Sequence, residues 1–148
     1  MVAAIDSPID VERTSQLDVA KEHKAPVVLF VDDDPHLISA VQRSFRPYRV
    51  QLEVAFHGMQ GVVSAVEIRP DVIVTDLQMP FATGDELVEC LSKHPSTAGV
   101  PIVIVTGRPG VTLTAKYRRL GVHCVLAKPL RFEDLLCELK SLITIESR

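Results

Sequence analysis

The sequence lacks the features that mark secreted and membrane-spanning proteins. Its three cysteines, Cys90, Cys124 and Cys137, are odd in number, widely spaced and surrounded by apolar residues. This pattern predicts reduced thiols rather than disulfides or a metal site. No apolar run approaches the roughly 18 residues that a membrane span needs. Acidic residues follow the apolar residues 2–5 too closely for a signal peptide. These absences predict a cytoplasmic protein without membrane contacts.

The sequence also lacks a surplus of positive charge and a glycine-rich phosphate loop. Lysine and arginine number 16 against 19 aspartates and glutamates, and the formal net charge of -3 argues against direct binding to nucleic acid. No G-x-x-x-x-G-K or G-x-G-x-x-G pattern follows the first apolar run, so nucleotide binding is not expected. The five histidines, His123 among them, show no metal-ligand spacing and are expected on the surface or in loops.

What the chain does contain is the composition and patterning of one α/β domain. Its 148 residues are 47% hydrophobic and 24% charged, as in ordinary soluble globular domains. Short apolar runs predict strands over residues 27–31, 50–54, 72–75, 102–105 and 124–126. Helical patterns follow them over residues 35–46, 59–69, 84–94, 110–120 and 132–142. This alternation predicts a doubly wound, five-stranded parallel sheet with five helices on its two faces.

Several local features refine this prediction. Asp34 and Pro35 suit the cap and first position of the first helix. The second strand alternates apolar and polar residues, so it is expected at an edge of the sheet. In the second helix Met59, Val62, Val63 and Val66 form the apolar stripe, and Gly61 among them is either a weak point or a mark of close packing.

The first 25 residues are mixed and polar, unlike the rest of the chain. They predict a flexible, solvated N-terminal extension, with a docking segment for a partner as the alternative. The domain itself is expected over residues 26–146.

Polar residues suited to phosphate chemistry follow four of the predicted strands. Asp32 and Asp33 follow the first, Asp76 the third, Thr106 the fourth and Lys128 the fifth. The carboxyl ends of parallel strands share one rim, where ligands bind. Three clustered carboxylates repel one another, and a hard cation such as Mg²⁺ relieves the repulsion. Each residue alone would be a cap, a turn residue or a surface lysine, but together they predict a phosphoryl-transfer site.

Four motifs also carry a resemblance to a known family: residues 28–35 (VLFVDDDP), 74–80 (VTDLQMP) with Gly84, 105–107 (VTG) and 127–129 (AKP). With their spacing they resemble the receiver domain of two-component response regulators, here of a stand-alone type, over about residues 26–145. The resemblance implies a flavodoxin-like sheet of order 2-1-3-4-5. It implies a phosphorelay signalling protein, not an enzyme, that slowly loses its own phosphate.

The resemblance also implies a role for each motif residue. Asp76 would be the phosphoacceptor, and Asp32, Asp33, Asp76 and the backbone carbonyl of Gln78 would bind Mg²⁺. Lys128 would pair with a phosphate oxygen, Thr106 would be the switch hydroxyl, and the small Gly107 would leave access to the acyl phosphate. Pro129 allows a cis Lys128–Pro129 bond that would aim the lysine inward.

The implied partners are a sensor histidine kinase or histidine phosphotransfer protein as donor, and an unknown downstream protein as target. The protein would act as a monomer or as a phosphorylation-dependent dimer. We expect a partner face on the surface of the last two predicted helices, including Lys116, Tyr117, Arg118 and Arg119, with a merely solvated basic helix as the alternative.

Two departures from the family pattern stand beside this resemblance. Val125 replaces the aromatic residue usual three positions before the lysine, and Arg108-Pro109 stiffens the loop after Thr106-Gly107. Two other functions remain open. Asp32-Asp33-Asp34 fits the start of a haloacid-dehalogenase-type phosphatase, although His36 does not suit that pattern. A pseudo-receiver would keep the same pocket and bind partners without phosphorylation.

Overall fold

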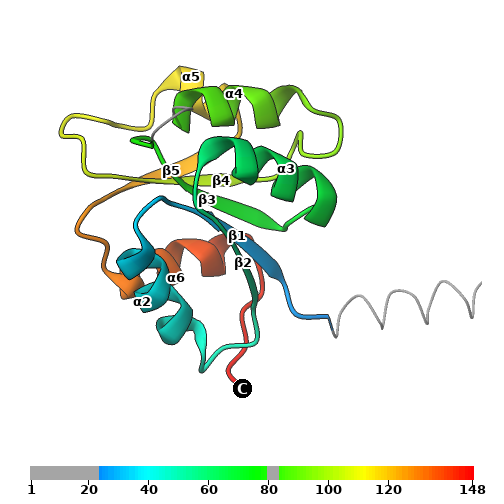
Figure 1. Ribbon diagram of the computed structural model, residues 1–148, viewed down its shortest axis with the longest axis vertical. Coiled ribbons are helices and arrows are strands. Elements are labelled where there is room, and N and C mark those ends of the chain that lie inside the picture. Colours follow the sequence, from blue (N-terminus) through cyan, green and yellow to red (C-terminus); the bar gives the residue numbers. More distant parts are fainter. Residues whose placement is uncertain (1–23, 80–83) are drawn as a thin grey trace, which may run out of the picture.

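The computed structural model describes residues 24–79 and 84–148, which are built around a five-stranded parallel sheet (Figure 1). Its strands are β1 (Val27–Val31), β2 (Gln51–Ala55), β3 (Val72–Asp76), β4 (Ile102–Thr106) and β5 (Val122–Ala127), in the order β2-β1-β3-β4-β5. Every residue of β1, β3 and β4 is buried, which explains their unbroken apolar sequences. The predicted strand order and the edge position of the second strand are confirmed.

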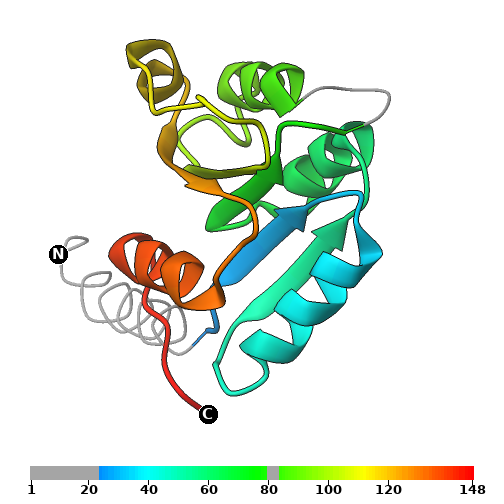
Figure 2. The same cartoon turned by 90° about the vertical axis from the view of Figure 1, so that its left-hand side faces the viewer.

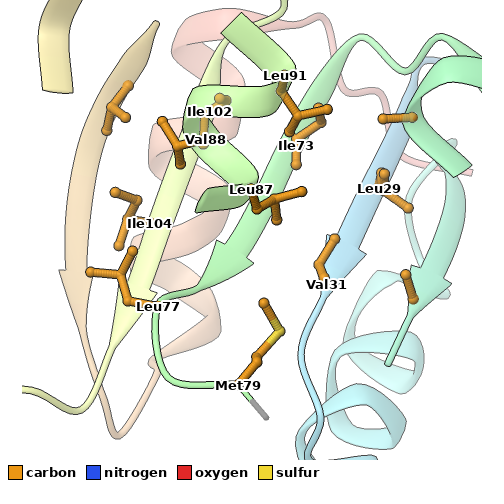
Figure 3. Packing of buried hydrophobic residues seen from close by; sticks show 13 residues of the cluster. Leu29, Val31, Ile73, Leu77, Met79, Leu87, Val88, Leu91, Ile102 and Ile104 are labelled. Atoms are coloured by element: carbon orange, nitrogen blue, oxygen red, sulfur yellow. The ribbon is translucent and has the colours of Figure 1, made fainter. Parts of the chain in front are cut away.

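Helices cover both faces of the sheet, as the alternation predicts. On one face lie α2 (Pro35–Phe45) and α6 (Phe132–Leu142), and on the other lie α3 (Gly58–Ile68), α4 (Gly84–Lys93) and α5 (Ala115–Arg119) (Figures 1 and 2). Each face has its own buried cluster because successive residues of a strand point to opposite sides. Figure 3 shows one cluster, in which Leu87 and Leu91 of α4 lie over Ile73 of β3.

The predicted start of the first helix is confirmed in detail. The Asp34 side chain accepts a hydrogen bond from the His36 backbone N–H at 2.9 Å, and Pro35 is the first helical residue. The cap satisfies an N–H group that has no partner within the helix. It also directs α2 away from the end of β1, where Asp32 and Asp33 lie.

The predicted apolar stripe of α3 is correct only in part, because Val62 packs against the core whereas Met59 and Val63 do not. Met59 and Val63 are 65% and 49% exposed, whereas Gly58, Gly61 and Ala65 face the sheet. A Cβ on Gly61 would lie 3.0 Å from Val31 Cγ2, so the glycine allows α3 to pack closely on β1. The close-packing interpretation of Gly61 is therefore confirmed. Small residues, rather than large ones, set the distance between this helix and the sheet.

The predicted helix over residues 110–120 is shorter in the structure. It begins at Ala115, because Thr114 Oγ1 caps it by accepting a hydrogen bond from the Tyr117 backbone N–H at 3.1 Å. Residues 111–114 are not helical, and the β-branched Val111 and Thr112 favour extended backbone there. The strand that follows is longer than predicted. Residues 1–23, which make up most of the predicted extension over residues 1–25, lie outside the described residues.

Candidate functional site

The three predicted acidic residues meet at the carboxyl ends of β1 and β3. Asp32 follows β1 and is fully buried, Asp76 ends β3 and is 4% exposed, and Asp33 is exposed. Carboxylate oxygens of the three residues lie within 4.8 Å of one another. Two adjacent, buried strands therefore place three negative charges at one point on the rim of the sheet.

Lys128 brings a positive charge into this acidic cluster. Its Nζ lies 2.9 Å from Asp32 Oδ2 and 3.0 Å from Asp76 Oδ2. The peptide bond between Lys128 and Pro129 is cis. Burial alone lowers the pKa of Lys128, but its contacts with the two carboxylates outweigh burial and raise that pKa. The lysine therefore stays charged between its two partners.

Asp32 has one satisfied carboxylate oxygen and one that lacks a hydrogen bond. Oδ1 accepts from the Asp34 backbone N–H at 2.9 Å, whereas the buried Oδ2 approaches Lys128 closely without hydrogen-bond geometry. Burial, and to a lesser extent Asp76, raise the pKa of Asp32 against the lowering effects of Asp34 and Lys128. A buried carboxylate oxygen without a hydrogen bond is suited to a cation, and the all-oxygen cluster fits Mg²⁺.

The remaining predicted residues line the same rim. Asp76 Oδ1 accepts a hydrogen bond from the Gln78 backbone N–H at 3.1 Å. The buried Thr106 ends β4, and its Oγ1 accepts from the Arg108 backbone N–H at 3.1 Å. Lys128 donates its own backbone N–H to the Thr106 carbonyl at 2.8 Å. All the predicted site residues thus lie at the carboxyl ends of β1, β3, β4 and β5.

Gly107 and the side chain of Gln78 flank Lys128. A Cβ on Gly107 would lie 3.9 Å from Lys128 Cβ and 4.0 Å from Gln78 Oε1, so a larger side chain would extend into the space beside both residues. The sequence motifs point only to the backbone of Gln78. Its side chain is missed because a polar residue in a loop looks like any solvated glutamine.

The predicted partner face on α5 already makes contacts within the protein. The Tyr117 hydroxyl donates to Asp85 Oδ1 of α4 at 2.6 Å, and Lys116 Nζ lies 3.3 Å from Glu89 Oε1. Burial, followed by the hydrogen bond to Asp85 and the negative charge of Asp85, raises the pKa of Tyr117 to about 12. Arg118 and Arg119 remain exposed. Val125 is partly buried and packs against the core on the same face as α5.

Comparison with known proteins places the fold in one family. Residues 28–140 match the family model of the response regulator receiver domain. The chain is 32% identical over 124 residues to hybrid signal transduction histidine kinase D of Dictyostelium discoideum, covering 84% of this chain and 8% of that protein. It is 31% identical over 109 residues to protein PilH of Pseudomonas aeruginosa, covering 74% of this chain and 90% of PilH.

A solved structure of similar fold contains a metal ion in its cleft. The receiver domain of sensor histidine kinase PA1611 from Pseudomonas aeruginosa was solved with magnesium coordinated in the active site cleft. It matches with a TM-score of 0.65 and 25% identity, over 80% of this chain and 97% of that one. The present chain spans half the length or less of the first curated relatives that it matches. Within residues 24–79 and 84–148, no helix is both long and apolar enough to cross a bilayer.

Proposed function

We propose that this chain, which belongs to the response regulator receiver domain family, carries its phosphoryl group on Asp76. Members of this family act as phosphoacceptors in two-component signalling and not as classical enzymes. The observation that supports Asp76 is its position. It ends the buried central strand β3, and one carboxylate oxygen faces Lys128 while the other accepts the Gln78 N–H. A carboxylate held between two donors is oriented for in-line attack.

The transfer makes one bond and breaks one bond. A carboxylate oxygen of Asp76 bonds to phosphorus, and the P–N bond to the donor histidine breaks, returning its electron pair to the imidazole nitrogen. Lys128 is placed to pair with a phosphoryl oxygen. Asp32, Asp33, Asp76 and the Gln78 carbonyl would hold Mg²⁺, which neutralises charge on the phosphoryl oxygens when bound.

Thr106 is proposed as the residue that responds to the phosphoryl group. Its Oγ1 accepts a hydrogen bond from the Arg108 N–H, so its own hydroxyl proton remains available for donation to a phosphoryl oxygen. Any movement of Thr106 reaches the backbone of Lys128 directly, because the Thr106 carbonyl accepts the Lys128 N–H.

The wider biological setting is also a proposal. A histidine kinase or a histidine phosphotransfer protein would supply the phosphoryl group in the cytoplasm, and a downstream protein would bind the phosphorylated form. Residues 26–146 would act as the receiver unit. The exposed Arg118 and Arg119 of α5 are the proposed partner face. If so, reversing both charges weakens partner binding without changing phosphorylation. Unchanged affinity for every partner would exclude this face.

Intact-mass measurement after incubation with acetyl phosphate and Mg²⁺ tests the acceptor. We expect one hydroxylamine-labile phosphate adduct on the wild type and none on Asp76→Asn. Asp134→Asn, at an exposed carboxylate on α6, is the matched control and keeps the adduct. An adduct that survives in Asp76→Asn assigns the phosphate elsewhere. Absence of any adduct, under conditions that label another receiver, favours a pseudo-receiver.

A further inference from the structure

A second cluster of possible metal ligands lies at the β5 edge of the sheet, apart from the acidic pocket. It consists of His123 and Cys124 of β5 with Glu138 of α6, and their ligand atoms lie within 4.8 Å of one another. In the described part of the chain, this cluster and the acidic pocket are the two groups of this kind. The phosphoacceptor chemistry uses none of its three residues.

An irregularity in β5 places the two adjacent residues on the same face. Ile102 pairs with Val122 and Val103 with Cys124, so His123 is an extra residue opposite this step of β4. Val122 packs in the cluster under α3, α4 and α5, whereas Cys124 packs in the cluster under α2 and α6. Side chains one residue apart normally point to opposite faces, and a bulge removes that alternation. Both His123 and Cys124 therefore face α6.

Residues of α6 already contact both side chains. His123 Nε2 lies 3.3 Å from Glu138 Oε2 and 3.2 Å from Ser141 Oγ. Burial, followed by the charge and a hydrogen bond of Glu138, raises the pKa of the Cys124 thiol to about 12. Glu138 is thus shared between an imidazole and a protonated thiol. The His123 and Glu138 side chains are each 36% exposed, which leaves a path for an ion from solvent.

We propose that His123, Cys124 and Glu138 form a Zn²⁺ site that fastens α6 to β5. A thiolate sulfur, an imidazole nitrogen and a carboxylate oxygen are the three ligand types that zinc prefers. Around a tetrahedral zinc with bonds of about 2.0–2.3 Å, ligand atoms lie roughly 3.3–3.8 Å apart. The His123 Nε2–Glu138 Oε2 distance of 3.3 Å already falls in this range, and all three ligand atoms lie within 4.8 Å of one another. The Cys124 thiol loses its proton to solvent as the Zn–S bond forms, and water or the Ser141 hydroxyl takes the fourth position.

The two clusters differ in the ions that they favour. The acidic pocket offers only oxygen, which suits Mg²⁺, whereas the β5–α6 cluster offers sulfur and nitrogen, which suit Zn²⁺. The acidic pocket lies at the carboxyl ends of the strands, whereas His123 and Cys124 lie near the start of β5 and Glu138 lies on α6. Excess Mg²⁺ should therefore fill the acidic pocket without blocking the β5–α6 cluster.

Co²⁺ titration of the reduced full-length chain in excess Mg²⁺ tests the site. Sulfur ligation gives a thiolate-to-cobalt charge-transfer absorption that carboxylates cannot give. We expect one such centre per chain, displaced by Zn²⁺ and lost in Cys124→Ala. Cys137→Ala is the matched control, since Cys137 is an exposed thiol beside Glu138, and it keeps the absorption. His123→Ala and Glu138→Gln should weaken Co²⁺ binding by at least about tenfold.

A measurement on the unaltered protein keeps the test independent of folding defects. X-ray absorption at the zinc edge, with one equivalent of Zn²⁺ and excess Mg²⁺, should show one sulfur neighbour at about 2.3 Å. A shell of oxygen and nitrogen alone would overturn the proposal. So would an absorption band that persists in Cys124→Ala, or one that disappears in Cys137→Ala. Phosphorylation of Asp76 is measured independently by intact mass, so the absence of a zinc site would not affect the phosphoacceptor proposal.

Discussion

At the scale of single residues, the negative charge of Asp32 in the acidic pocket is expected to lower the stability of the fold. Asp32 is fully buried, one of its oxygens lacks a hydrogen bond, and burial raises its pKa. An acid with a raised pKa costs stability once the pH is above its folded-state pKa. That cost disappears as the pH falls toward the value of the unfolded chain. Lys128 offsets this cost only in part, because it is shared with Asp76.

We therefore expect Asp32→Asn to unfold at higher urea concentration than the wild type at pH 7 in a chelator, because Lys128 keeps Asp76 as its partner when the Asp32 charge is removed. Asparagine keeps the acceptor for the Asp34 N–H and removes the buried charge. The advantage should shrink as the pH falls toward 4. Mg²⁺ should raise the stability of the wild type and not that of the variant. Asp134→Asn, on the surface of α6, should change stability by less than about 0.5 kcal/mol. A variant less stable than the wild type at pH 7 would contradict this account.

At the scale of elements, close contacts rather than large apolar stripes decide how helices sit on the sheet. The three inward residues of α3 are Gly58, Gly61 and Ala65. Periodicity alone predicts the helix and its approximate ends, but it assigns Met59 and Val63 to the wrong face. The small residues and the large apolar residues of α3 both recur at helical spacing. Only the space between α3 and Val31 of β1 decides which of the two sets faces the sheet. That space depends on β1, a strand distant in the sequence.

Gly61→Ala should destabilise the protein although alanine is the better helix former. The gain in helix propensity is about 1 kcal/mol. The added methyl would lie 3.0 and 3.1 Å from the two methyl groups of the fully buried Val31, and such overpacking costs about 1–3 kcal/mol. We expect a net loss of about 1 kcal/mol by urea unfolding. Val63→Ala, on the exposed face of α3, should be within about 0.5 kcal/mol of the wild type. A more stable Gly61→Ala protein would show that α3 can shift outward.

Helices α4 and α5 are joined by a partly buried hydrogen bond between Tyr117 and Asp85, and the ionisation of Tyr117 can be followed by absorbance. The chain has two tyrosines and no tryptophan, so Tyr48→Phe leaves Tyr117 as the sole reporter. We expect its phenol to ionise near pH 12 instead of the usual value of about 10. Since the neutral phenol is favoured in the fold, stability should fall as the pH rises from about 10 toward 12. Adding Asp85→Asn should lower the midpoint. A midpoint near 10 with a native circular dichroism spectrum would argue against a hydrogen bond between Tyr117 and Asp85 in solution.

At the scale of the whole molecule, the sequence predicts the architecture and the acidic pocket because both depend on strands. Buried parallel strands are continuous apolar runs, and the residue after each run lies on the common rim. The same reasoning fails for α5, whose start depends on the Thr114 cap. It also fails for the His123–Cys124–Glu138 cluster. There, a one-residue irregularity in β5 and a glutamate from α6 create a proximity that no local spacing encodes.

Residues 146–148 form backbone contacts with residues 47–49. The Arg148 N–H donates to the Pro47 carbonyl at 2.8 Å, the Arg49 N–H donates to the Glu146 carbonyl at 2.7 Å, and Ser147 forms an antiparallel bridge with Tyr48. Removing residues 146–148 should lower the free energy of unfolding by about 1–2 kcal/mol, since a net hydrogen bond contributes about 1 kcal/mol. The yield of phosphate adduct should not change. Unchanged urea unfolding would show that these contacts add nothing in solution.

The burial of β3 along its whole length determines how fast its backbone amides exchange hydrogen with solvent. Asp76 ends a strand whose five residues are all buried between two equally buried neighbours. Amides in such a strand exchange with solvent only when the entire domain opens, so they report global unfolding. Exposed helices such as α5 open locally and more often. If Asp76 is phosphorylated as proposed, the modification lies on a slowly exchanging strand, and partners would meet it through surfaces that exchange faster.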